Sequence, residues 1–167
     1  GLHYTKGDGY YQEYKDGRTL VEYGLKPFIQ NGEEVAWSDL IRKKAMDNRF
    51  GGGIFSVSYK NHRLNAAVGG GFNRYEGHHF GQVLWVKDYI GELAPNQEYY
   101  RNNGTKNDGN IYVKADYQLA TGLNMYADMQ YRHITYQIQG TNDKWNSVTN
   151  DGLQRLDIDE KFGFFNP

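Results

Sequence analysis

The chain contains no cysteine and only three prolines among its 167 residues. The lack of cysteine excludes disulfide frameworks and thiolate metal sites. No apolar run reaches the ~18 residues that a membrane-spanning helix requires, so the sequence predicts no such helix. The net charge of −1, with no basic cluster beyond the short patch Arg42–Lys44, argues against nucleic acid as a partner.

Recognisable catalytic motifs are also missing. The chain has no Gly-x-Ser-x-Gly, no His-Glu-x-x-His and no phosphate-binding glycine loop, and the glycines from Gly69 to Gly71 fall inside a predicted strand. Carboxylates are plentiful, but no two of them form an acid–base pair that the sequence can position. We therefore expect neither an enzyme nor a bound cofactor.

Aromatic residues and glycine are abundant, with 15 Tyr, 8 Phe, 3 Trp and 21 Gly. Hydrophobic residues make up only 38% of the chain, which leaves little to bury in a compact soluble core. Aromatic residues favour strands, and glycine allows backbones to approach closely. The composition therefore predicts a mainly β protein.

Strict alternation of apolar and polar residues is the clearest local pattern. It runs from Ile111 to Leu119 and resumes from Leu123 to Arg132, after a break at residues 120–122. A period of two predicts strands with one apolar and one polar face. Such strands, about ten residues long and joined by short and long connections in turn, are typical of a membrane-spanning barrel wall.

The register of this hairpin follows from its two faces. Closing Leu119 on Leu123 places Val113 opposite Met129, and a slip of one residue would move every apolar side chain to the wrong face. The same register places Ala115 opposite Ala127 and Lys114 opposite Asp128. Opposite charges facing each other across a strand pair are favourable, so the pairing is consistent on both faces.

A second alternating pair is predicted earlier in the chain, with strands at Gly51–Lys60 and Arg63–Tyr75. Asn61 and His62 form the expected two-residue turn, since Asn tolerates positive φ. If Lys60 pairs with Arg63, both strands sort their residues onto matching faces. The pairs expected on the apolar face are Tyr59–Leu64, Val57–Ala66 and Phe55–Val68.

The remaining segments are predicted as one helix, two long loops and two short pieces of strand. Asp39–Asp47 is a short amphipathic stretch that Ser38 or Asp39 can cap, and it predicts one loop helix. Glu76–Asp108 and Gln137–Glu160 are predicted as long loops, which are uncommon in compact soluble domains and expected on the outer side of outer-membrane barrels. The remaining strand pieces are Leu2–Thr5, which ends a strand, and Lys161–Pro167, which begins one.

Five segments resemble the mid-barrel region of TonB-dependent outer-membrane receptors, particularly those of the Bacteroidetes. They are Gly1–Lys15, Asp39–Asn61, Ala66–Trp85, Asn110–Arg132 and Lys161–Pro167. The resemblance implies a parent protein in the outer membrane, with a barrel of about 22 strands around an N-terminal plug. It also implies uptake of a scarce siderophore, cofactor or glycan, driven through the TonB complex.

The chain departs from that family because it contains no plug, no TonB box and only a handful of strands. We expect residues 1–167 to be a single segment of a β-barrel domain, an open antiparallel sheet when isolated. Since roughly eight strands are needed to close the smallest membrane barrels, we expect no activity from this segment alone. Open strand edges also predict self-association of the isolated chain.

Candidate binding residues lie in segments predicted as loops or as barrel wall. Eight aromatic residues are candidates for stacking on a ligand; the alternative is that they pack the loops together or form an interfacial girdle. They are Tyr10, Tyr11, Tyr14, Trp37, Trp85, Tyr99, Tyr100 and Trp145. Polar wall residues that guide a substrate or simply face a wet lumen are Lys114, Asp116, Asp128 and Arg132. His78 and His79 beside Glu76 are weak metal candidates, because adjacent residues of an extended chain point in different directions.

Two other classes of protein stay open at this point. One is a self-contained soluble β-domain that binds carbohydrate through its loop aromatics, and the other is a small complete outer-membrane or surface structural protein. A self-sufficient domain predicts a closed or sandwiched sheet with an apolar interior, whereas a wall segment predicts open edge strands.

Overall fold

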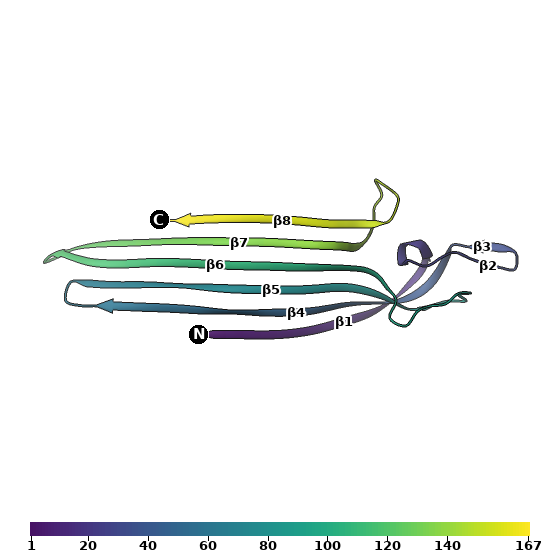
Figure 1. Cartoon of the computed structure of the whole chain (residues 1–167), viewed down its shortest axis with the longest axis horizontal. Helices are drawn as coiled ribbons and strands as arrows, with labels where there is room; N and C mark the ends of the chain where they lie inside the picture. The colour runs from purple at the N-terminus through teal and green to yellow at the C-terminus, as the bar shows by residue number, and fades with distance from the viewer.

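The computed structural model describes all residues, 1–167, and contains one large antiparallel sheet of six strands in the order β1-β4-β5-β6-β7-β8. Each strand pairs with its neighbours in a single layer, and β1 and β8 form the two edges (Figure 1). The strands are β1 Leu2–Thr19, β4 Trp37–Lys60, β5 Leu64–Val86, β6 Glu98–Ala120, β7 Leu123–Trp145 and β8 Leu153–Asn166. The sequence-based expectation of a mainly β, open antiparallel sheet is confirmed.

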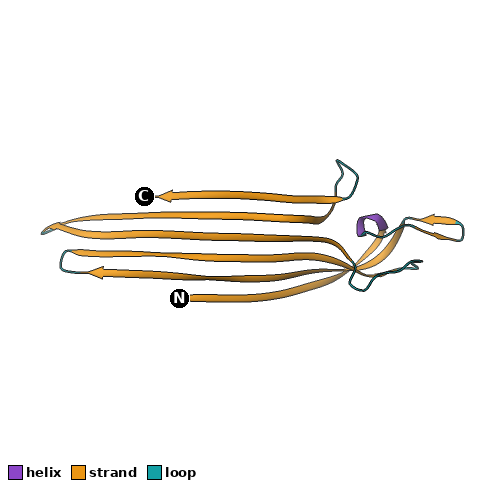
Figure 2. Cartoon of the chain, viewed as in Figure 1, coloured by secondary structure: helices purple, strands orange, loops and turns teal.

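The other elements lie beyond one end of the sheet. They are the 3₁₀ turn η1 Leu20–Tyr23 and a small hairpin of β2 Phe28–Gln30 and β3 Glu33–Val35 (Figure 2). No helix of the structure has the length and apolar character needed to span a membrane. The end of the sheet that carries these elements is called the loop end, and the opposite end, with its two tight turns, is called the turn end.

The sheet has no core of its own. Only 12 of the 167 residues are buried, and the buried apolar side chains form one cluster at the loop end. A sheet is normally stable only when it packs one face against another layer, so this sheet leaves both faces for something else to cover. The cluster comprises Leu20, Tyr23, Leu25, Phe28, Leu40, Val83 and Val86.

The predicted register of the β6–β7 hairpin is confirmed. Val113 pairs with Met129, Ala115 with Ala127 and Lys114 with Asp128. At the turn itself Ala120 pairs with Leu123 after a bulge, and Gly122 takes the positive φ of 80° that the two-residue turn needs.

The register predicted for the β4–β5 hairpin is wrong by two residues. Lys60 pairs with Asn65, so Val57 faces Val68 and Phe55 faces Gly70. The turn includes Arg63, because the Asn61 side chain accepts hydrogen bonds from the backbone N–H groups of Arg63 and Leu64, at 2.9 and 2.8 Å. A side-chain turn of this kind needs no positive φ. Since the shift is an even number, the predicted faces are unchanged.

The predicted loop helix at Asp39–Asp47 is wrong, because these residues belong to β4. Their apolar spacing fits a helix, but β4 is a central strand that pairs with β1 on one side and β5 on the other. Two ladders of backbone hydrogen bonds outweigh a weak local helical preference. The only helical turn is η1, which directly follows β1 in the sequence.

The predicted long loops at Glu76–Asp108 and Gln137–Glu160 are also wrong over most of their length. β5 continues to Val86 and β6 starts at Glu98, while β7 continues to Trp145 and β8 starts at Leu153. Near the loop end the strands carry polar residues on the face that is apolar near the turn end. The alternation therefore disappears while the hydrogen-bonded ladder continues, and a search for alternation misses the strands.

Candidate functional site: two faces of one sheet

Pairing assigns every strand residue to one of two faces. We call the face that carries Val57, Val68 and Val113 the banded face, and the face that carries Lys114 and Asp128 the polar face. The banded face is apolar only near the turn end. Its large exposed side chains there include Phe55, Val57, Val68, Ile111, Val113, Met125 and Met129, several of them more than half exposed.

Aromatic residues border this apolar band at both of its ends. Toward the turn end lie Tyr59 and Tyr117, and toward the loop end lie Tyr4, Phe72, Tyr131 and Phe165, all on the banded face. On β5 the band runs from Leu64 to Phe72, which is about 26 Å along the strand at ~3.3 Å per residue. Membrane barrels carry an apolar band about 25 Å tall with an aromatic girdle at each interface.

The band ends abruptly on the side of the loop end. Beyond Phe72 on β5 the banded face carries Arg74, Glu76 and His78. Arg74 pairs with Glu76 at 2.7 Å, and His78 lies 2.6 Å from the Asn103 side-chain oxygen. The same side of the sheet therefore carries apolar side chains near the turn end and charged or polar ones near the loop end.

The polar face carries all four predicted lumen residues, on β6 and β7. Lys114 and Asp128 lie opposite each other with 3.6 Å between Nζ and Oδ2, and Tyr126 donates a 3.0 Å hydrogen bond to Asp128. Asp116 pairs with Tyr126 in the register, and Arg132 contacts Asp108 on β6. This face is not purely polar, since β8 adds Phe162 and Phe164.

Near the loop end an ion-pair network joins strands β1, β4 and β7 on the polar face. Arg42 lies 3.0 Å from Glu13 and 3.3 Å from Asp143, and Lys44 also contacts Asp143. Because β5 and β6 separate β4 from β7, these contacts require the sheet to be concave on this side. Hydrogen bonds from Lys15 and Arg42 keep the pKa of Glu13 below its usual value.

The eight aromatic candidates lie in strands, so their predicted placement in loops is wrong. Tyr99 and Tyr100 are neighbours, with ring centroids 5.0 Å apart in an edge-to-face arrangement. Tyr11 shares the polar face with Tyr100, in the register row of Lys44 and Gly81. Tyr11, Tyr99 and Tyr100 therefore lie close together, and the other five candidates lie elsewhere. They are Tyr10 and Tyr14 on the banded face, Trp37 at the start of β4, Trp85 near the end of β5 and Trp145 at the end of β7.

The histidine pair lies within β5 and is split between the two faces. His78 belongs to the banded face beside Asn103, whereas His79 belongs to the polar face near Tyr11 and Lys44. Glu76 is bound to Arg74. No group of three or more potential ligands from His, Asp and Glu comes together anywhere in the chain.

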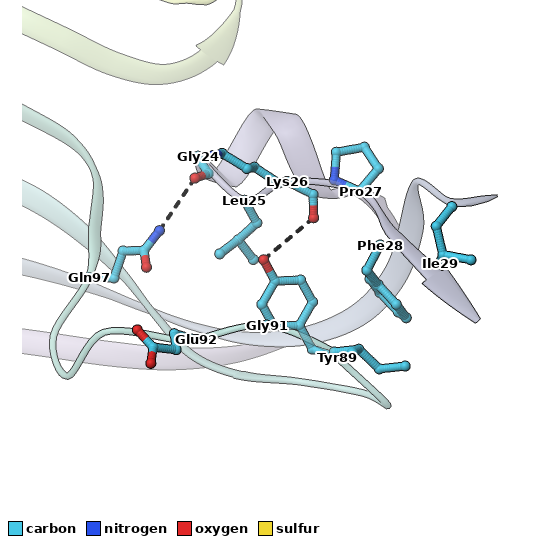
Figure 3. A pocket seen from close by; sticks show the side chains of 11 residues that line it. Gly24, Leu25, Lys26, Pro27, Phe28, Ile29, Tyr89, Gly91, Glu92 and Gln97 are labelled. Atoms are coloured by element: carbon cyan, nitrogen blue, oxygen red, sulfur yellow. Dashed lines mark hydrogen bonds between the residues drawn. The ribbon is translucent and has the colours of Figure 1, made fainter. Parts of the chain in front are cut away.

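Figure 3 shows a crevice at the loop end, between the connection that follows β1 and the one that follows β5. The Tyr89 hydroxyl donates to the Lys26 carbonyl and the Gln97 amide to the Gly24 carbonyl, each at 3.4 Å. Buried side-chain oxygens without a partner occur only at Asp47, Gln82 and Asn107, outside the crevice lining. The crevice is therefore a seam where two connections pack, and none of its lining side chains carries a buried polar atom that lacks a hydrogen-bond partner.

Asp39 of β4 holds the last part of β1 in place and predicts an acid-sensitive step. Its carboxylate accepts hydrogen bonds from the Tyr14 hydroxyl at 2.6 Å and the Gly17 amide at 2.9 Å, which lower its pKa from 3.8 to about 2. A lowered pKa stabilises the folded state above pH ~4, and this contribution is lost as the pH falls from ~4 to ~2. We expect the protection factor of the Gly17 amide, which is its exchange rate in an unstructured chain divided by the observed rate, to fall over that interval when measured by NMR.

The control is the variant Asp39→Asn, which lacks the titrating group. Its side-chain oxygen can still accept the Gly17 hydrogen bond, so the Gly17 protection factor should stay constant between pH 4 and 2. An acid-induced loss of protection of equal size in both proteins would contradict the role given to Asp39.

No family model matches the chain, and neither do any curated protein or solved structure. Function therefore rests on the surfaces described above. The aromatic residues that border the band were not singled out from the sequence, although Tyr117 and Tyr131 lie near the ends of alternating runs and could have been found by that position.

Proposed function

We propose that the chain forms part of the wall and outer loops of a TonB-dependent receptor in the outer membrane, where the parent protein takes up a scarce siderophore, cofactor or glycan. The observation that carries the proposal is the apolar band with its two aromatic borders. Lipid is the environment that such a band fits, because it covers apolar side chains over a fixed height and leaves both ends of the strands wet.

The openness of the sheet supports the same proposal. One face of the open sheet presents a continuous apolar patch, in which at least half of the surface of Phe55, Val57 and Met129 is exposed. Soluble proteins avoid such patches in contact with water. The outer edges of β1 and β8 have no partner strand. Since about eight strands are the minimum for closure, further strands on both edges would complete the wall.

The length of the strands favours a receptor over a simple pore. β5 runs from Leu64 to Val86, and the band takes up only its part from Leu64 to Phe72. The rest of the sheet rises beyond the band and ends in the buried cluster at the loop end. A structured outer region of this kind offers surfaces for a ligand before it enters the barrel. The five segments that resemble TonB-dependent receptors extend over both regions.

Cysteine scanning tests the membrane part of the proposal, since the natural chain has no cysteine. Neighbouring strand residues point to opposite faces, so Val57→Cys and Ser58→Cys form a matched pair, as do Met129→Cys and Gln130→Cys. In cells that express the natural gene product, we expect a water-soluble maleimide to label the cysteines at 58 and 130 and to spare those at 57 and 129.

Two further results limit the interpretation. His78→Cys and His79→Cys lie beyond the band and should both react. Equal labelling at 57, 58, 129 and 130 would overturn the membrane wall and favour the soluble carbohydrate-binding domain. The TonB dependence is tested separately by capture of the TonB C-terminal domain on the detergent-solubilised gene product, and absence of binding would remove that part alone.

A further inference from the structure

Three tyrosines on the polar face lie over glycines of β5. A Cβ atom added to Gly81 would come within 2.3 Å of the Tyr100 ring, and one added to Gly69 within 2.5 Å of the Tyr112 hydroxyl. Tyr100 and Tyr112 are the direct cross-strand partners of these two glycines. On β5 itself, Tyr75 covers Gly77 in the same way, at 2.5 Å.

These contacts explain an unusual pattern of burial. Gly69, Gly77 and Gly81 are buried in a sheet that has no second layer, because the tyrosine side chains cover them. The tyrosines themselves stay partly exposed on the open, polar side of the sheet. The Tyr75 hydroxyl donates a 2.9 Å hydrogen bond to Asn48, which fixes the position of that ring.

The three glycines follow one line along β5, since their numbers differ by even steps and no bulge interrupts the ladder between Gly69 and Gly81. The line is about 40 Å long at ~3.3 Å per residue. We call Tyr75, Tyr100 and Tyr112 with their glycines the tyrosine track. Hollows of the same face lie at both of its ends, beside Tyr11 and His79 and beside Tyr112 and Asn110.

The cations beside the track already contact carboxylates. Lys44 contacts Asp143, Lys114 lies 3.6 Å from Asp128, and Lys106 and Arg132 both contact Asp108. Paired cations leave little attraction for an anionic chelate or for the carboxylates of a haem-like ring. Amide side chains on the same face, which donate and accept hydrogen bonds without net charge, include Asn73, Asn102 and Asn110.

We propose that the tyrosine track binds a neutral oligosaccharide along the inner side of the proposed barrel wall. This inference rests on the proposed function and deepens it by naming the class of ligand. Sugar rings present flat C–H faces to aromatic rings and hydroxyl groups to amides, and the track offers both kinds of partner in one line. Rings held down on glycine backbones are preorganised for stacking, so little conformational entropy is lost on binding.

Equilibrium dialysis of the detergent-solubilised natural gene product against maltohexaose, cellohexaose, mannohexaose, xylohexaose and chitohexaose tests this proposal. At least one hexasaccharide should bind. Tyr100→Ala and Tyr112→Ala should each weaken that binding by about 2- to 12-fold, the loss expected for one aromatic contact. Phe80→Ala, which removes a ring from the banded face beyond the band, should leave the affinity within about 2-fold.

The variant Gly81→Ala distinguishes a ligand-binding role of the tyrosine rings from a purely structural one. This change keeps every tyrosine and suits a strand, but its methyl group displaces the rings of Tyr100 and Tyr99, so we expect weaker binding while the sheet itself is retained. Failure of every hexasaccharide to bind, equal affinity in all variants, or binding of haemin in their place would overturn the track. The cysteine-labelling pattern is unaffected by these outcomes, so failure of the track and failure of the membrane wall are distinguishable.

Discussion

Val68→Arg is expected to destabilise the protein in the proposed membrane wall by about 2–4 kcal/mol, which corresponds to a 30-fold to several-hundred-fold change in the folding equilibrium. Val68 lies in the middle of the band on β5, between Val57 of β4 and Val113 of β6. In the proposed wall, an arginine there would place its guanidinium among lipid chains near the bilayer midplane. Urea titration of the natural gene product in phospholipid vesicles, followed by tryptophan fluorescence, measures the loss.

The neighbouring substitution Ala67→Arg is the matched control. It introduces the same side chain one residue along the same strand, but on the polar face beside Ser58 and Lys114. We expect a change below about 1 kcal/mol, since the guanidinium remains in water and Asp128 lies close to Lys114. Similar effects of both substitutions would show that the two faces do not meet different environments.

The sequence was informative where one face of the sheet carries apolar side chains and the other carries polar ones. In β6 and β7 the alternation predicted the strands, their faces and the pairing of Val113 with Met129. In β4 and β5 it predicted the faces correctly even though the pairing of Lys60 was wrong by two residues. Side-chain periodicity determines the face, whereas the hydrogen bonds of the turn determine how far one strand slides along the other.

Beyond the band the sequence was misleading for a physical reason. Arg74, Glu76 and His78 occupy positions on the banded face that are apolar nearer the turn end, so no alternation marks the rest of β5. A strand with two wet faces is stabilised by its backbone ladder and by ion pairs, and neither leaves a periodic signal. The apolar spacing of residues 39–47 predicts a helix when it is considered alone, because this spacing contains no information on the pairing of β4 with β1 and β5.

The candidate site was only partly predictable for a related reason. The four charged wall residues were found because alternation placed them opposite apolar neighbours, and all four lie on the polar face. Tyr75 and Tyr112 were not singled out, because their significance depends on glycines that pairing or close spacing places beneath them. Gly69, Gly77 and Gly81, at even intervals in one strand, are the sequence feature that could have drawn attention to this face.

Leu20→Ala is expected to detach the cluster at the loop end from the sheet, at a cost of about 2–5 kcal/mol. Leu20 is completely buried, and it anchors η1 against a cluster that includes Leu40 and Val83 from the sheet. Its amide donates a 3.0 Å hydrogen bond to the Ala36 carbonyl, which joins the two ends of the connection. The logarithm of the hydrogen–deuterium exchange rate of residues 20–25 should rise in proportion to the lost free energy, by one factor of ten for each ~1.4 kcal/mol.

Val21→Ala provides the comparison within the same turn, since Val21 is 46% exposed and its truncation should cost well under 1 kcal/mol.

The effect of Leu20→Ala should also extend to the polar face, because Tyr23 of the cluster contacts Tyr99. The two ring centroids are 4.8 Å apart, and the Tyr99 hydroxyl lies 3.4 Å from Arg42 in the ion-pair network. Burial raises the pKa of Tyr99 above its ordinary value, so a detached cluster should return that pKa toward 10, which ultraviolet titration of the tyrosines measures. Faster exchange at residues 20–25 without a change at Tyr99 would mean that the cluster and the polar face are independent.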